Sequence, residues 1–225
     1  MITTSRIAPR AIIFFGPDGS GKTTQANMLV DSLSHRGIKT RKLWLRSLHT
    51  LAFIISKIAM KLLHLKDVYE FRSKYSYKQP LRSLWYGIEL VSILPLVFSK
   101  MFIPLKLGET VVAERFVVDW IVSLSYVTRN EALLNGALAR LVLGLIPKES
   151  LIIYVDATAD AIRARGRKED SFEFIEFQRK SYTKLARLIN AITIDTSDKN
   201  LDEVHKLILE LALGNSLTSD TTRSR

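Results

Sequence analysis

The sequence predicts an α/β protein whose core is a five-stranded parallel sheet with helices on both faces. Short, almost continuously apolar runs alternate along the chain with longer segments of helical periodicity. This is the pattern expected where strands are buried on both sides and joined by crossover helices. The chain has 225 residues, of which 47% are hydrophobic, and this is enough for one domain with a sizeable core.

The first half of the chain supplies three of the strands. An apolar run at 11–15 before a glycine-rich turn predicts a buried strand, and the helix predicted at 23–36 ends before Gly37, which suits the left-handed position after a helix. A second strand is expected at 38–45. Helices are expected at 48–65 and at 80–100, the latter kinked by Pro95. Gly108 separates them from a strand at 110–113.

The second half continues the alternation. Periodicity predicts helices at 119–127, 131–143, 159–165, 171–190 and 201–213, with strands at 151–155 and 191–194. The stretch 214–225 is rich in Ser and Thr and has no apolar period, so we expect a disordered tail. The single domain is therefore predicted to span residues 1–213.

Positive charge is concentrated in one part of the chain. The chain carries 33 Lys+Arg against 22 Asp+Glu, a formal net charge of +11. Residues 32–108 hold 14 of the basic residues and three of the acidic ones, so the remainder is neutral. The same segment contains the most apolar runs. Such a segment favours an anionic ligand or surface as its partner.

Composition also limits the class of protein. The chain has no cysteine, which excludes a disulfide scaffold, a thiol nucleophile and a cysteine zinc site, and which fits a reducing compartment. Residues 1–10 have no apolar run, so we expect no secretory signal. The most apolar stretch, 84–107, is interrupted by three charged residues and two prolines, and we expect it to be a buried or surface-lying helix. These features predict a cytoplasmic protein.

The strongest chemical signal is a phosphate-binding loop. Residues 16–23 read Gly-Pro-Asp-Gly-Ser-Gly-Lys-Thr and match G-x-x-x-x-G-K-[ST] between a predicted strand and a predicted helix. Glycines let backbone N–H groups converge on phosphate oxygens, the lysine contacts the β- and γ-phosphates, and the threonine binds Mg²⁺. This context favours a phosphate site over a chance glycine turn. The predicted ATP-binding residues are Gly16, Asp18, Gly19, Ser20, Gly21, Lys22, Thr23 and Thr24.

Further charged residues favour a kinase. Asp18 places a carboxylate inside the loop, where an acceptor hydroxyl could meet the γ-phosphate. Glu114 and Arg115 follow the strand at 110–113, at the sheet edge where ligands bind in open α/β folds. The sequence contains no N-K-x-D motif, which weighs against a GTPase. A cationic cluster lies between two predicted helices, and its alternative interpretation is a solvated helix end; it comprises Arg163, Arg165, Arg167 and Lys168.

With these motifs the chain resembles the thymidylate kinase family of nucleoside monophosphate kinases over most of its length. The loop with its Asp and the trailing Thr-Thr-Gln at 23–25 is similar to the family's loop, and Glu114-Arg115-Phe116 stands where the family has Asp-Arg-Tyr. Further matches are Tyr154-Val155-Asp156 with Arg165, Phe172 to Tyr182, and Ile194-Asp195. The resemblance implies a P-loop NTPase-type fold with a short lid at about 163–171. It also implies transfer of the ATP γ-phosphoryl group to a nucleoside monophosphate, with dTMP as the first candidate.

The resemblance also implies roles for individual residues. Lys22 and the loop amides would hold ATP, with Mg²⁺ at Thr23 and Glu114, although Asp156 is a rival for the acid. Asp18 would bond the 3′-hydroxyl of the acceptor sugar, and Arg115 would bind the acceptor phosphate. The lid arginines would neutralise the transferring group as the lid closes over it, and they are Arg163, Arg165 and Arg167.

The pattern is lost in the acceptor-binding segment, about 44–107. Leu45-Arg46-Ser47 stands in place of the family's Arg-Glu-Pro. Candidates for base stacking and acceptor binding are Arg46, Phe71, Arg72, Arg82 and Trp85, and each could instead be an ordinary helix residue. A kinase for another acceptor, such as a nucleoside or a modified nucleotide, therefore stays open.

A different class of function also stays open for the basic segment. The predicted helix at 48–65 carries Lys57, Lys61 and His64 on one face and leucines and isoleucines on the other. Such a helix could lie on an anionic membrane, although packing on the sheet is the favoured interpretation. Aromatic residues interleaved with cations could instead stack on nucleic-acid bases, which is not favoured. The expected partners are ATP, with Mg²⁺, and a nucleoside monophosphate; a homodimer and peripheral membrane contact are alternatives.

Overall fold

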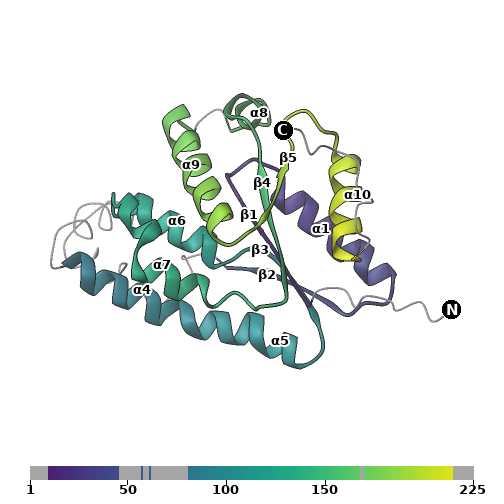
Figure 1. The fold of residues 1–225 in the computed structure, drawn as a ribbon, viewed down its shortest axis with the longest axis horizontal. Helices are drawn as coiled ribbons and strands as arrows, with labels where there is room; N and C mark the ends of the chain where they lie inside the picture. Colours follow the sequence, from purple (N-terminus) through teal and green to yellow (C-terminus); the bar gives the residue numbers. More distant parts are fainter. Residues whose placement is uncertain (1–9, 46–56, 58–60, 62–80, 168–169, 215–225) are drawn as a thin grey trace, which may run out of the picture.

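The computed structural model describes residues 10–45, 57, 61, 81–167 and 170–214. At its centre lies one sheet of five parallel strands in the order β2-β3-β1-β4-β5 (Figure 1). With helices on both faces, this is the predicted α/β class and the sheet order found in P-loop NTPases. The strands are β1 (Ala11–Phe15), β2 (Thr40–Trp44), β3 (Thr110–Arg115), β4 (Ser150–Asp156) and β5 (Ile192–Asp195).

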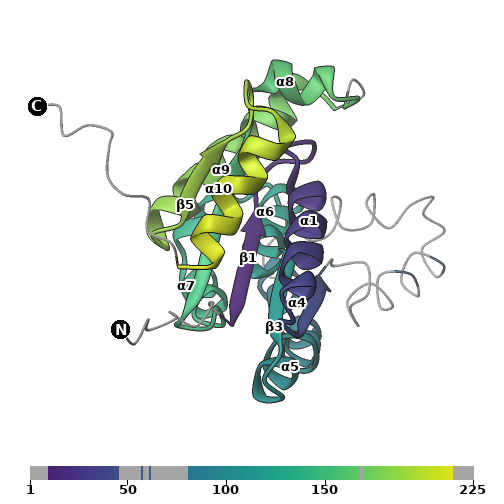
Figure 2. The ribbon, with the colours of Figure 1, turned by 90° about the vertical axis from the view of Figure 1, so that its right-hand side faces the viewer.

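The helices of the described residues cover the two faces separately (Figures 1 and 2). One face packs against α1 (Lys22–His35) and α10 (Leu201–Ala212). The other face packs against the remaining longer helices, which are α4 (Leu81–Val97), α6 (Val117–Val127), α7 (Ala137–Leu143) and α9 (Phe172–Leu188). The short α8 (Ala159–Ala164) follows β4.

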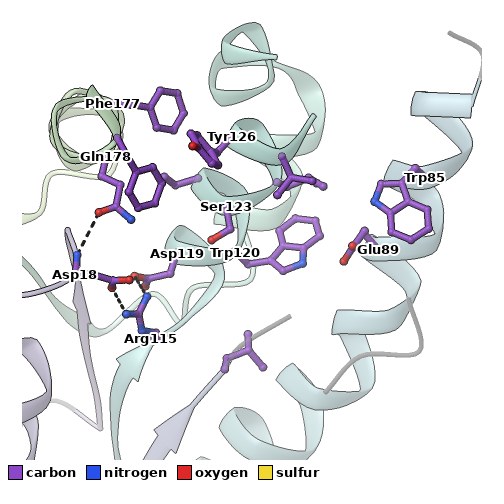
Figure 3. A pocket seen from close by; sticks show the side chains of 15 residues that line it. Asp18, Trp85, Glu89, Arg115, Asp119, Trp120, Ser123, Tyr126, Phe177 and Gln178 are labelled. Atoms are coloured by element: carbon purple, nitrogen blue, oxygen red, sulfur yellow. Dashed lines mark hydrogen bonds and ion pairs between the residues drawn. The ribbon is translucent and has the colours of Figure 1, made fainter. Parts of the chain in front are cut away.

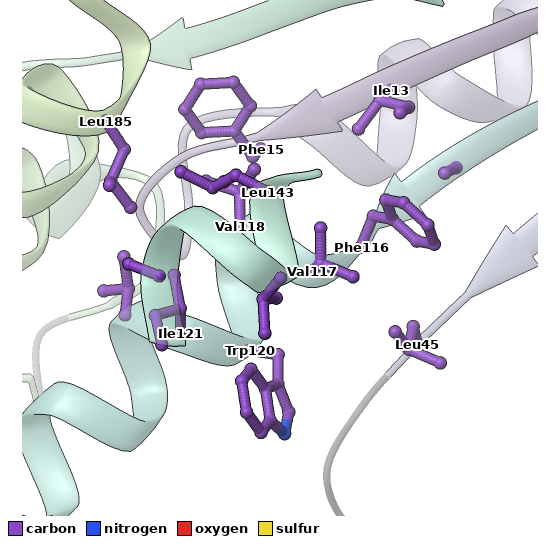
Figure 4. Packing of buried hydrophobic residues seen from close by; sticks show 14 of the residues in the cluster. Ile13, Phe15, Leu45, Phe116, Val117, Val118, Trp120, Ile121, Leu143 and Leu185 are labelled. Atoms are coloured by element: carbon purple, nitrogen blue, oxygen red, sulfur yellow. The ribbon is translucent and has the colours of Figure 1, made fainter. Parts of the chain in front are cut away.

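Successive side chains of β1 point to opposite faces of the sheet and belong to two separate core clusters. Ile12 and Phe14 join the cluster under α1 and α10, whereas Ile13 and Phe15 join the cluster on the opposite face. Figure 4 shows Phe15 beside Val118 of α6 and Leu185 of α9. Because β1 is buried on both faces, its sequence is continuously apolar, and the strand predicted at 11–15 is confirmed.

Most predicted boundaries shift by one to three residues. Gly37 follows Arg36, the C-cap residue of α1, and has a φ of +75°, the left-handed conformation predicted for it. β3 extends two residues past the predicted end, so that Glu114 and Arg115 belong to the strand. The predicted helix at 48–65 lies outside the described residues except for Lys57 and Lys61, and the tail at 215–225 also lies outside them.

Two predicted helices needed correction. The single helix expected at 131–143 is a 3₁₀ turn, η3 (Glu131–Asn135), followed by α7, because Gly136 between them is extended, with a ψ of 173°. The helix expected at 80–100 does not end there. It continues through a π-helical turn, η2 (Phe98–Phe102), into α5 (Ile103–Lys106). The π turn begins three residues after Pro95, which lacks the N–H that a regular α-helix requires.

The helical stretch Arg82–Lys106 is long and apolar enough to cross a membrane, by length and composition alone. From the sequence, its charged residues and prolines were expected to make it a buried or surface-lying helix instead. About a third of its most apolar window is buried inside the protein (33%). Its inner side chains, which include Trp85, Ile93 and Met101, belong to the main core cluster. It is therefore in part a core helix and in part a surface helix.

Candidate active site

The loop between β1 and α1 has a backbone that its glycines make possible. Gly16 has a φ of +144°, and a Cβ on this residue would lie 2.1 Å from the carbonyl oxygen of Val155. Gly21 caps α1 in the left-handed conformation, with a φ of +97°. Any other residue at these two positions would be strained, and at Gly16 it would also collide with β4. The glycines thus let the loop turn from the carboxyl end of the central strand, β1, into the start of α1, a helix of 14 residues.

Lys22 is buried within this loop. Its ammonium donates a hydrogen bond of 2.6 Å to the carbonyl oxygen of Pro17. Burial, and secondarily the positive charge of Arg115, lowers the pKa of Lys22 to about 8. A phosphate entering the loop would give this ammonium an anionic partner in place of a neutral carbonyl. The exchange would favour both phosphate binding and the charged form of Lys22.

Thr23 lies beside an acidic residue from β3. Its hydroxyl donates a hydrogen bond to Oε1 of Glu114, and Nζ of Lys42 lies 2.6 Å from Oε2 of the same carboxylate. Burial alone would raise the pKa of Glu114, but the hydrogen bonds from Lys42 and Thr23 hold it below its usual value. The carboxylate is therefore ionised at neutral pH and is fixed next to the loop.

This pair of oxygens fits a magnesium ion. Mg²⁺ prefers hard oxygen ligands and binds through one or two protein oxygens together with substrate phosphates and water. The Thr23 hydroxyl and the Glu114 carboxylate supply such oxygens at the end of the loop. Within the described part of the chain, there is no group of three or more His, Asp or Glu side chains that could hold a metal ion. A site of this kind would thus depend on nucleotide phosphates for its remaining contacts.

Arg115 links the loop to a second set of acidic residues. Its guanidinium hydrogen-bonds Asp18 of the loop, and its Nη1 lies 3.8 Å from Oδ1 of Asp119 at the start of α6. Asp119 also accepts hydrogen bonds from the Tyr182 hydroxyl (3.1 Å) and from the backbone N–H of Phe116 (3.2 Å). The network joins the loop, β3, α6 and α9 in one cluster.

The pKa values of the two aspartates in this cluster, Asp119 and Asp18, are shifted in opposite directions. Burial raises the pKa of Asp119 to about 6, even though Arg115 and Lys22 oppose the shift. Burial would also raise the pKa of Asp18, but Arg115 and Lys22 more than offset it and hold the pKa below its usual value. Asp18 is thus a carboxylate at neutral pH, while Asp119 titrates within the mildly acidic range.

A cavity of about 200 Å³ opens beside this network (Figure 3). Asp18, Arg115 and Asp119 form its polar end, and Gln178 of α9 accepts a hydrogen bond from the backbone N–H of Asp18 (3.2 Å). The Nε1 of Trp120 is buried and has no hydrogen-bond partner among the described residues. The walls are mostly apolar and aromatic, formed by Leu45, Trp85, Trp120, Val122, Leu124, Tyr126, Val127, Phe174 and Phe177, with Glu89 and Ser123 as further polar groups. Such a cavity suits a small ring-shaped ligand with polar substituents.

The predicted lid arginines occupy different positions. Arg165 donates hydrogen bonds to Thr196, through Nη1 to the hydroxyl (3.0 Å) and through Nη2 to the carbonyl oxygen. Thr196 in turn donates to the carbonyl oxygen of Ser20 in the loop (3.0 Å). The Cγ of Arg167 lies against Gly19, and Arg163 is exposed in the last turn of α8. Two of the three arginines are thus beside the loop.

Asp156, the alternative acid for Mg²⁺, is held by another partner. The guanidinium of Arg179 in α9 donates to both of its carboxylate oxygens, from Nε at 3.2 Å and from Nη2 at 3.1 Å. A bidentate pair of this kind is among the stronger hydrogen-bonded ion pairs. Of the two acids, Glu114 is therefore the one that lies next to Thr23.

Only some of the residues expected to bind the acceptor lie within the described part of the chain. Trp85 lines the cavity, whereas Arg82, three residues earlier on α4, does not. Arg46, Phe71, Arg72 and Lys168 lie outside the described residues. The residues at this site that were not predicted from the sequence are Lys42, Asp119 and Gln178; Glu89 is one of the three charged residues that interrupt the apolar stretch at 84–107. Asp119 and Glu89 share a detectable signal, because each is an acidic residue within an otherwise apolar helix.

No protein-family model matches this chain, and no curated protein matches it either.

Proposed function

We propose that this protein is a P-loop kinase that transfers the γ-phosphoryl group of Mg·ATP to a small acceptor bound in the cavity beside the loop. The observation that carries the proposal is the position of Asp18, which belongs to the phosphate loop and also lines the cavity. An acceptor in the cavity would therefore lie next to the γ-phosphate of an ATP held by the loop. The α/β fold and its sheet order are compatible with this chemistry.

In the proposed reaction, Lys22 and the loop amides would hold the phosphates, and Thr23 and Glu114 would hold a magnesium ion, which would supply neutralisation of phosphate charge. An acceptor oxygen attacks the γ-phosphorus, the bond from that phosphorus to the β,γ-bridging oxygen breaks, and ADP leaves. Phosphoryl transfer depends mainly on positioning and charge neutralisation. Arg165 and Arg167, next to the loop, would supply positive charge as the group transfers.

The resemblance to thymidylate kinases makes a nucleoside monophosphate, with dTMP first, the first acceptor to test. In that case the aromatic walls would enclose the base and Arg115 would bind the acceptor phosphate. For this role Arg115 would have to exchange its hydrogen bond with Asp18 for one with the phosphate.

One observation favours a second candidate, a kinase of the same fold whose acceptor is an uncharged alcohol such as a nucleoside. Among the described residues that line the cavity, three are acidic (Asp18, Glu89, Asp119) and Arg115 is the one cation. A phosphate dianion in this cavity would be repelled by carboxylates, whereas a hydroxyl acceptor gains a proton acceptor in Asp18. A phosphate oxygen needs no such base.

The test is ADP formation from Mg·ATP across two matched sets of acceptors, nucleoside monophosphates and the corresponding nucleosides, with Lys22→Ala as the negative control. Turnover with one set, lost in Lys22→Ala, would support kinase activity and identify the acceptor class. ATP binding without acceptor-dependent ADP formation in either set would contradict the proposal.

A further inference from the structure

The helical stretch formed by α4, η2 and α5 has an outer face that is apolar. Leu84, Val91 and Phe98 follow one another at intervals of seven residues, which places them on one face of the helix. Ile103 and Leu107 extend the exposed apolar surface past the π turn. These five side chains are between 53% and 65% exposed. In Figure 1 this stretch forms the lower edge of the molecule, and it packs on the opposite face of the sheet from α1 and α10.

The inner face of the same stretch fixes it to the protein. Trp85, Ile93, Val97 and Met101 are almost fully buried in the main core cluster against the sheet and α6. A transmembrane orientation would remove these side chains from the core and leave that side of β3 uncovered. The stretch can therefore lie on a membrane with its outer face but cannot cross it while the fold persists.

Apart from one buried acid, the charged residues of this stretch are cationic. Between residues 81 and 108 the sequence contains Arg82, Lys100 and Lys106 and a single acid, Glu89, which is 2% exposed and faces the cavity. Lys100 and Lys106 are exposed and form no ion pair with any described residue. A helix that exposes both apolar side chains and unpaired lysines is complementary to the interface of an anionic bilayer. A second copy of this chain on the same face would instead bring lysines of the two copies together.

We infer that the outer face of α4, η2 and α5 docks on an anionic lipid bilayer, with the apolar side chains in the interface and the lysines on lipid headgroups. Docking leaves the core intact, since none of the residues involved is buried. Because Trp85 and Glu89 project from the opposite side of α4 into the cavity, docking would hold the cavity one helix away from the membrane surface (Figure 3). This inference does not depend on the kinase proposal.

The test is sedimentation of the full chain with vesicles of phosphatidylcholine alone or with one third phosphatidylglycerol. We expect binding to the anionic vesicles, weak binding to the neutral ones, and a loss of binding as salt is raised, because headgroup attraction is screened. The double variant Val91→Ser/Phe98→Ser should lower the partition coefficient at least tenfold. Leu188→Ser, a 53% exposed leucine at the end of α9, is the matched control and should bind as the wild type does.

A second pair of variants tests the contribution of charge to membrane binding separately from that of the apolar side chains. It changes exposed lysines only and leaves the core packing unaltered. Lys100→Glu/Lys106→Glu should weaken binding at least tenfold, since each cation near the surface contributes about a fivefold factor. Lys206→Glu on α10, on the opposite side of the sheet, should have little effect. No binding to anionic vesicles, or equal binding by Val91→Ser/Phe98→Ser, would overturn the inference. A wild-type dimer that becomes monomeric in that variant would also overturn it, because a second copy would then cover the face.

Discussion

The loop edge of the sheet and the stretch formed by α4, η2 and α5 differ in how their charged and apolar groups are arranged. At the loop edge, charged side chains are partly buried and bound to one another, as in the contacts of Asp18 with Arg115 and of Lys42 with Glu114. Along the helical stretch, the acid is buried and the lysines and apolar side chains are exposed. The first arrangement is typical of a site for a small charged ligand, and the second is typical of a surface that meets another surface.

The largest effect expected from a single substitution is at Lys22. Lys22→Ala removes the buried ammonium from the loop and should lower kcat/KM for ATP by about 10²- to 10³-fold or more, the range seen when one preorganised charge donor is lost. Lys184→Ala, which removes an exposed lysine of α9, is the control and should be neutral. Steady-state ADP formation measures both. Equal activity in the two variants would mean that the loop does not bind the transferred phosphate.

The two faces of α4 should respond differently to truncation. Ile93→Ala on the inner face creates a cavity in the core and should lower the free energy of unfolding by about 2–5 kcal/mol. Val91→Ala, two residues away on the outer face, should change it by less than about 0.5 kcal/mol. Urea denaturation compares the two. Similar losses would show that the outer face is also packed, and the distinction between the faces would fail.

Asp18→Asn distinguishes the two acceptor classes. If the acceptor is an alcohol, loss of the carboxylate should lower kcat about 10²-fold while ATP affinity stays within about twofold. If the acceptor is a phosphate, the variant frees Arg115 and should lower KM for the acceptor without a comparable loss in kcat. Initial rates at varied acceptor concentration, with ATP binding measured separately, decide between them. A loss of ATP binding in this variant would instead assign Asp18 to the loop alone.

Asp119 should give the smallest of these effects, a dependence of stability on pH. Its pKa is about 6 in the folded protein and 3.8 ordinarily, so between these values the folded state binds more protons than the unfolded state. Its contribution to stability is therefore present below about pH 4 and is lost as pH rises through 6; it amounts to about 3 kcal/mol over the whole range and to about 2 kcal/mol between pH 4.5 and 7. Asp119→Asn should remove this slope, which denaturation at pH 4.5 and 7 would measure. An unchanged difference between the two pH values would contradict the assignment.

The loop edge was predictable from sequence because its parts are local. The loop follows β1 directly, its glycines are needed for positive φ, and Glu114 and Arg115 end the strand beside it. The cavity was not predictable in the same way. Leu45, Trp85, Trp120 and Phe174 come from four separate parts of the chain, and only packing brings them together. The continuation of the helix past Lys100 was not predicted; there a π turn joins α4 to α5, and Pro104 lies in the first turn of α5, a position that proline tolerates.

Whether the loop and the cavity act together in one reaction can be measured by following the label of γ-labelled ATP. In the wild type, the label should appear in an acceptor bound in the cavity at a rate that saturates with acceptor concentration. In Lys22→Ala this transfer should be lost, while Lys184→Ala should retain it. Label released only as free phosphate, at a rate independent of every acceptor in both sets, would mean that the cavity does not hold the acceptor of the loop's phosphoryl group.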